Sequence, residues 1–279
     1  MPTFETAGHV ALDLIVPAGM VSVGTWGEPR VDVEVTPIRG DDASAQAAAE
    51  TRIEAVERGG RHEVSVRVPK REGRLGIFGR SPELLVAIRC PEGADLELAT
   101  HGADLDARGP LGAVGLRSAS GDAMLADASE LSFTTASGDL VAAVVSGALT
   151  TKSASGDVAV RAVGGASTVS TVSGDVRLGE TDALAAVNTV SGDVELDAAG
   201  GGARVSCVSG DVHVATRPGL ALWIDVQSVS GSVTSELDVG DTPTGGDAQV
   251  ELRVRTVSGD VRLTRAAAAQ PGARLRSDA

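Results

Sequence analysis

Aromatic residues are scarce in this sequence. Only 2% of its 279 residues are aromatic and there is no tyrosine, although hydrophobic residues as a whole make up 42%. A thick core draws on large aromatic side chains, whereas the small aliphatic residues that dominate here suit a thin interior between two closely spaced sheets. The hydrophobic fraction excludes a wholly disordered chain and favours a flattened β-structure.

Positive charge is also in short supply. The chain carries 24 Lys and Arg residues against 38 Asp and Glu residues, a formal net charge of −14. Such an excess of negative charge repels phosphate backbones and anionic lipid headgroups, so we expect no nucleic-acid partner. No stretch approaches the roughly 18 apolar residues that a membrane-spanning helix needs, and we expect no membrane insertion.

Cysteine is nearly absent. Cys90 and Cys207 lie far apart and neither belongs to a CxxC motif, so no metal site is expected from them. Residues 1–20 contain Glu5 and Asp13 but no Lys or Arg, which does not match the basic and apolar pattern of a secretory signal. These features predict a cytoplasmic protein, and nothing in the sequence indicates a cofactor.

The dominant positive feature is a tripeptide, Ser-Gly-Asp, that recurs between residues 120 and 260. Successive copies are separated by 17, 18, 18, 18, 18, 21 and 28 residues, counted from serine to serine. The copies are Ser120–Asp122, Ser137–Asp139, Ser155–Asp157, Ser173–Asp175, Ser191–Asp193, Ser209–Asp211 and Ser258–Asp260, with Ser230–Ser232 as a variant. A nearly fixed period of this length is the signature of a repeat architecture.

Each copy is followed by alternating apolar and variable residues, as in Val158–Val160 and Val194–Leu196, which indicates a half-buried strand. A second apolar segment, such as Thr171-Val172, precedes each serine, and glycine-rich turns lie between the segments. The sequence therefore predicts an all-β fold: a parallel β-solenoid with about 18 residues and two strands per coil. Each strand should pair with its equivalent in the next coil.

The repeat also divides the chain. Residues 86–265 are expected to form the solenoid. Residues 1–85 are expected to form an all-β, sandwich-like N-terminal cap, because alternating apolar segments occur there without the tripeptide. A short helix is expected near Asp42–Glu50, and residues 266–279 are expected to be a disordered tail.

The serial Ser-Gly-Asp-Val-x-Leu copies resemble the bacterial β-strand-repeat family labelled "putative adhesin", a domain of unknown function. Other segments that carry the resemblance are Val66–Lys70, Gly76–Arg80, Pro91–Gly93 and Trp223–Val226. The resemblance extends to about Thr264. It implies a β-solenoid and brings no established activity and no catalytic residues.

The aligned aspartates allow two interpretations. In register, neighbouring carboxylates would lie about 5 Å apart and repel each other by about 1 kcal/mol in water. A row of Ca²⁺ ions would offset this repulsion, and the candidate ligands are Asp139, Asp157, Asp175, Asp193 and Asp211. Alternatively, each Asp caps turn N–H groups and accepts a serine hydroxyl of the adjacent coil. Because Ca²⁺ prefers roughly six to eight oxygens, the structural role is favoured.

Two surfaces are candidates for recognition. Alternation places the Thr, Ser and Asp of Thr-Val-Ser-Gly-Asp outward, which predicts a flat polar face for a polysaccharide, ice or another copy of the chain. The second candidate is the basic loop Lys70–Arg80. One interpretation is that it docks onto a partner or onto the acidic solenoid of a neighbouring molecule. The other is that Phe78 packs under the cap and the arginines are solvated. The candidate contact residues of the loop are Arg71, Arg74, Ile77, Phe78 and Arg80.

Catalysis has little support. The four histidines are scattered, and neither a Gly-x-Ser-x-Gly motif nor a phosphate-binding loop is present. We therefore predict a non-enzymatic scaffold or protein-interaction module whose partner is an unidentified protein or a second copy of the chain. The alternatives are an adhesin-like or glycan-binding surface protein and a polysaccharide-acting β-helix enzyme.

Overall fold

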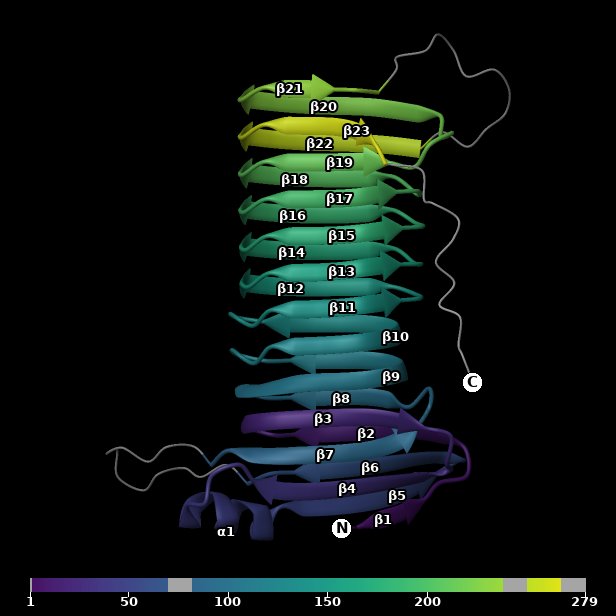
Figure 1. Cartoon of the computed structure of the whole chain (residues 1–279), viewed down its shortest axis with the longest axis vertical. Helices are drawn as coiled ribbons and strands as arrows, with labels where there is room; N and C mark the ends of the chain where they lie inside the picture. Colours follow the sequence, from purple (N-terminus) through teal and green to yellow (C-terminus); the bar gives the residue numbers. More distant parts are fainter. Residues whose placement is uncertain (1, 70–81, 238–249, 267–279) are drawn as a thin grey trace, which may run out of the picture.

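The protein is a tall, narrow stack of β-strands with a short helix at its N-terminal end (Figure 1). The computed structural model describes residues 2–69, 82–237 and 250–266. This part of the chain forms 23 strands and one helix. Most strand pairs are parallel and join successive coils, so the predicted parallel β-solenoid is confirmed.

The regular part of the stack runs from β11 to β19, with two strands in each coil. The strands are β11 (Leu140–Val145), β12 (Leu149–Ser155), β13 (Val158–Val163), β14 (Ser167–Ser173), β15 (Val176–Thr181), β16 (Ala185–Ser191), β17 (Val194–Ala199), β18 (Ala203–Ser209) and β19 (Val212–Thr216). Odd-numbered strands pair with one another in a first sheet, and even-numbered strands pair in a second sheet. Partner residues such as Val158 and Val176 are 18 positions apart, which confirms the coil length.

The core is a thin layer between these two sheets. Val158, Val176 and Val194 stack in one column of the first sheet, and each is 1% exposed. Val169 and Val187 of the second sheet are fully buried opposite them. Valine fits because it fills the short distance between the sheets and its branched side chain suits an extended backbone.

Two long strands connect the regular coils to the N-terminal end. β9 (Gly102–Arg117) and β10 (Ala123–Thr135) pair with each other along most of their length. The first half of β10 pairs with β11 and its second half with β12, so β10 contributes to both sheets. β9 does the same with two strands from the N-terminal region.

The N-terminal coil is inserted out of sequence order. The strands concerned are β2 (His9–Ile15), β3 (Ala18–Trp26), β6 (Arg61–Arg67), β7 (Leu84–Pro91) and β8 (Asp95–Ala99). The coil β2–β3 lies between β6–β7 on one side and β8–β9 on the other, with parallel pairing on both sides. The expected domain division at residue 85 falls within β7, and parallel pairing runs across it. Residues before 85 therefore supply solenoid coils as well as a cap.

The cap itself is antiparallel. β1 (Thr3–Glu5) and β7 both pair with β4 (Arg30–Pro37), and β5 (Arg52–Arg58) pairs with β6. The expected helix is confirmed as α1 (Asp42–Glu50). It begins after Asp41, whose carboxylate accepts the N–H of Ser44 at 2.6 Å.

The C-terminal end is also out of sequence order. Its strands are β20 (Leu222–Ser230), β21 (Val233–Ser235), β22 (Val250–Ser258) and β23 (Val261–Arg265). β22 lies between β18 and β20, and β23 lies between β19 and β21. The last coil in sequence is therefore the next to last in space, as the upper end of Figure 1 shows. The expectation that each coil stacks on its predecessor is wrong at both ends of the solenoid. Of the expected tail, residues 267–279 lie outside the described residues.

Candidate interaction surface

The aspartates of the repeat form a continuous row of hydrogen bonds along one corner of the solenoid. In each coil the Asp Oδ1 accepts the backbone N–H of the aligned residue in the next coil, at 2.8–3.0 Å. In spatial order the row is Asp104, Asp122, Asp139, Asp157, Asp175, Asp193, Asp211, Asp260 and Ser232. The favourable contacts with these N–H groups offset the repulsion between neighbouring carboxylates.

This aspartate row bears on the calcium hypothesis. Each of the five candidate ligands uses one carboxylate oxygen for a backbone N–H and lies exposed. Among the described residues, no group of three or more His, Cys, Asp or Glu side chains is arranged to hold a metal ion. The hydrogen bond to the next coil is therefore a sufficient reason for Asp to recur in each repeat, and no bound ion is needed to explain it.

The aspartate row also explains the unusual coil order at the C-terminal end. Asp260 accepts from Ser232 at 2.8 Å, while Ser232 lies in the outermost described coil, and no coil of the described residues lies beyond it. If the coils followed sequence order, Ser232 would lie inside the row and would leave Asp260 N–H without a carboxylate. Insertion of β22–β23 thus places every Asp where its carboxylate has a donor.

The outermost coil should loosen in acid. The backbone N–H of Ser232, followed by its side chain, lowers the pKa of Asp260 from its ordinary value of 3.8. Because the folded pKa lies below the unfolded one, this contact stabilises the coil above pH 3.8 and is lost as the pH falls through the folded pKa. Hydrogen exchange should show the protection of the Ser232 N–H falling as the pH drops below 3.8. Asp260→Asn keeps the acceptor oxygen but does not titrate, so it should abolish this loss of protection; the same loss in Asp260→Asn would contradict the assignment.

The predicted outward direction of the repeat threonines is wrong. Thr171 and Thr189 are 5% exposed and Thr256 is 4% exposed, whereas the following valines lie on the surface. Val169, two residues before Thr171, is fully buried and sets which alternate positions of β14 face inward. The buried hydroxyls remain satisfied, because each donates to the carbonyl of the serine two residues later at 3.3 Å.

Outward-facing valines consequently form a stripe on the second sheet. We call this the valine stripe: Val172, Val190, Val208, Val257 and Val229, in spatial order, with exposed fractions between 47% and 82%. A shallow groove of about 400 Å³ runs along Val172, Val190 and Val208. Its other side is lined by the neighbouring outward column, which includes Ser170, Asn188 and Ser206. A run of exposed aliphatic residues over five coils is typical of a surface that contacts another molecule.

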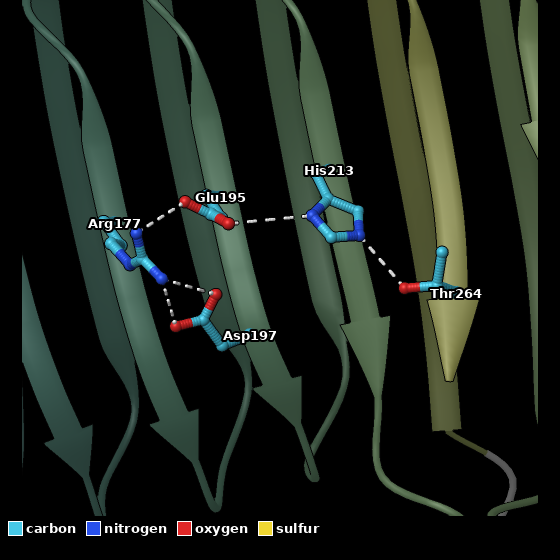
Figure 2. Close-up of polar contacts among 5 residues, drawn as sticks. All are labelled: Arg177, Glu195, Asp197, His213 and Thr264. Atoms are coloured by element: carbon cyan, nitrogen blue, oxygen red, sulfur yellow. Dashed lines mark hydrogen bonds and ion pairs between the residues drawn. The ribbon is translucent and has the colours of Figure 1, made fainter. Parts of the chain in front are cut away.

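The outer face of the first sheet is bridged instead by polar side chains (Figure 2). Arg177 lies 3.1 Å from Glu195 and 3.2 Å from Asp197, on the next coil. His213 lies 3.0 Å from the hydroxyl of Thr264 and 3.8 Å from Glu195. These exposed pairs span β15, β17, β19 and β23 and contribute little stability individually. Their side chains are occupied with one another, so this face presents a weaker candidate for recognition.

Both cysteines are free and buried. Burial raises the pKa of Cys90 to about 12 and also raises the pKa of Cys207. Since the thiolate is the reactive form, neither should react with Ellman's reagent at pH 8 in the folded protein, and both should react in denaturant. Cys207 occupies the column of Thr189 and Thr256, so Cys207→Thr is a matched control that should leave one reactive thiol after unfolding. Rapid labelling of Cys207 in the folded protein would contradict its placement.

The predicted contact residues Arg71, Arg74, Ile77, Phe78 and Arg80 lie outside the described residues. The structure instead brings together the valine stripe and the aspartate row, whereas the sequence pattern predicted a polar face of Thr, Ser and Asp. The column Val169, Val187, Val205 and Val254 could have shown which residues face inward. It lies two residues before the threonine column and therefore on the same face of each strand. No helix among the described residues is long and apolar enough to cross a membrane.

Comparison with known proteins identifies the family. No curated protein matches the chain significantly. Among solved structures, a "putative cell adhesion protein" from Clostridium sporogenes is 10% identical, with 93% of each chain covered and a TM-score of 0.24. A "putative adhesin" from Bacteroides fragilis is 13% identical, with 94% of this chain and 95% of that chain covered and a TM-score of 0.36. The sequence profile of Toastrack DUF4097 matches residues 31–264, which include every Ser-Gly-Asp copy. The chain therefore belongs to the Toastrack DUF4097 family.

Proposed function

We propose that this protein is a non-enzymatic interaction module that binds a protein partner through the outer face of its second sheet. The observation that carries the proposal is the valine stripe, which leaves five aliphatic side chains about half exposed or more on consecutive coils. Leaving such surface in water is unfavourable, at roughly 25 cal/mol for each Å² that a partner would cover. The repeat does not require valine there, because the same column holds Ala136 and Ala154 in earlier coils.

The geometry of the rest of the surface supports binding rather than catalysis. The aspartates are distributed evenly, one to a coil, and each has the same backbone donor. A catalytic pair of carboxylates would need two different environments that set one pKa apart from the other. A uniform row provides a scaffold with the same chemistry at every coil.

Site-specific photocrosslinking in the source cells tests this function. A photoreactive side chain at Val190 should capture a protein, whereas the same group at Val141 should not. Val141 is the matched control because it is exposed to a similar extent, 47% against 48%, but lies on the first sheet. Capture at both positions, or at neither, would contradict the proposal, and capture of a polysaccharide at Val190 would favour the glycan-binding alternative.

We further propose a cytoplasmic location. Both thiols are free in the structure, which suits a reducing compartment. Cell fractionation followed by detection of the protein tests this; recovery from the cell surface or medium would contradict it and favour an adhesin-like role.

A further inference from the structure

The valine stripe lies beside the aspartate row throughout its length. In four of the five coils the exposed valine precedes an aspartate by three residues, as Val190 precedes Asp193, and in the outermost coil Val229 precedes Ser232. The carboxylates of this row are exposed, and one oxygen of each accepts a backbone N–H. On the other side of the stripe, the groove is lined by Lys152 at one end and by the uncharged Ser170, Asn188 and Ser206. A ligand for this surface must therefore combine apolar side chains with positive charge on one flank.

One segment of the chain has this composition. Residues Lys70–Arg80 contain four basic residues and one acidic residue, together with the adjacent pair Ile77 and Phe78, in a protein whose net charge is −14. Aliphatic and aromatic side chains suit the valine stripe, and arginines suit exposed carboxylates because they bind them in a bidentate manner.

The segment cannot reach the stripe of its own molecule. Phe78 lies six residues before Leu84, the first residue of β7, so a fully extended chain carries it about 21 Å from that strand. The pairings β6–β2, β2–β8, β8–β9, β9–β10, β10–β12, β12–β14 and β14–β16 separate the coil of β6–β7 from that of Val190 by seven steps. Seven coil steps correspond to about 34 Å along the solenoid. The occupant must come from another molecule.

We propose that the valine stripe and aspartate row bind segment Lys70–Arg80 of a second copy of this chain. This inference rests on the proposed function and names its partner. The strands on either side of the segment, β6 and β7, lie towards the capped end of the solenoid, and the stripe lies towards the opposite end (Figure 1). Two copies side by side and antiparallel would make both contacts at once, which closes the assembly as a two-fold dimer.

Sedimentation velocity over a concentration series tests the proposal on the full chain. The wild type should dimerise, and rising salt should weaken the dimer because the contact is partly ionic. The pair Val190→Asp and Val208→Asp, and separately the pair Ile77→Ser and Phe78→Ser, should each raise the dimer Kd at least tenfold. Val141→Asp puts the same charge at a similarly exposed valine of the first sheet and should dimerise as the wild type does.

A second set of variants isolates the charge without removing the aspartate hydrogen bonds. Asp175→Asn, Asp193→Asn and Asp211→Asn together keep each acceptor oxygen but remove three charges, and should raise the Kd severalfold and flatten its salt dependence. A synthetic peptide of residues 69–82 should compete with dimerisation. Circular dichroism with thermal unfolding confirms that each variant is folded before it is compared.

The outcomes separate this inference from the proposed function. A wild type that stays monomeric, stripe variants that dimerise normally, or loss of the dimer in Val141→Asp would each overturn self-docking. If the chain is monomeric but photocrosslinking at Val190 still captures a different protein, the proposed function stands and only the identity of the partner is wrong. If neither is observed, both proposals fail.

Discussion

Replacing Gly192 with alanine should destabilise the protein by roughly 3–5 kcal/mol. Gly192 has a φ of +132°, a conformation that side-chain-bearing residues rarely adopt. A Cβ atom there would also lie far inside contact distance of the Gly174 carbonyl on the neighbouring coil. That carbonyl belongs to a column of corner backbones stacked at the same spacing, so it has no room to move aside.

Two other glycines separate the contributions to this effect. Gly219 has a φ of +83° with no atom within 4 Å of a Cβ, so Gly219→Ala should show only the backbone cost, about 1–2 kcal/mol. Gly24 has neither a positive φ nor a close neighbour, and Gly24→Ala should be neutral or slightly stabilising. Urea unfolding measures all three. Equal losses for Gly192→Ala and Gly219→Ala would show that the corners are not closely stacked.

Asp193→Ala should cost about 1–3 kcal/mol, because the N–H of Asp211 loses its acceptor. Asp193→Asn keeps that acceptor and should be close to neutral. It should be slightly stabilising at low salt, since one charge of the aspartate row is removed. The contrast between the two variants measures the hydrogen bond rather than the charge.

The same pair of variants addresses calcium. If the aspartate row is structural, Ca²⁺ should leave the unfolding midpoints of the wild type and of Asp193→Asn unchanged. A rise in the wild-type midpoint that Asp193→Asn abolishes would instead support the calcium hypothesis. Chelator-treated samples provide the baseline for both.

Local regularity made much of the fold predictable. The Ser-Gly-Asp period and the alternation after each Asp were sufficient for the parallel solenoid, its 18-residue coil and its two strands per coil. The helix Asp42–Glu50 was also predictable, because capping and helix propensity act within a few residues. Each of these features depends on neighbours that are close in the sequence.

The candidate site was predicted less well. In Val169-Ser170-Thr171-Val172 an apolar residue lies at both alternations, so either Thr171 or Val172 could face inward from the sequence pattern alone. A shift of one residue reverses every side chain of a strand, and only the packing of Val169 in the core selects the observed face. The valine stripe therefore became visible only in the folded structure.

The sequence by itself determined what each coil is: two short strands, a glycine corner and an aspartate that faces the next coil. Only the tertiary structure decided which coil lies beside which, at β2–β3 near the start and at β22–β23 near the end. The physical reason is that coils with the same inward columns can pair with one another equally well, so local pattern leaves their order open. Contacts that differ between coils resolve it, as Ser232 does at the end of the aspartate row, where the described residues offer no further N–H to accept.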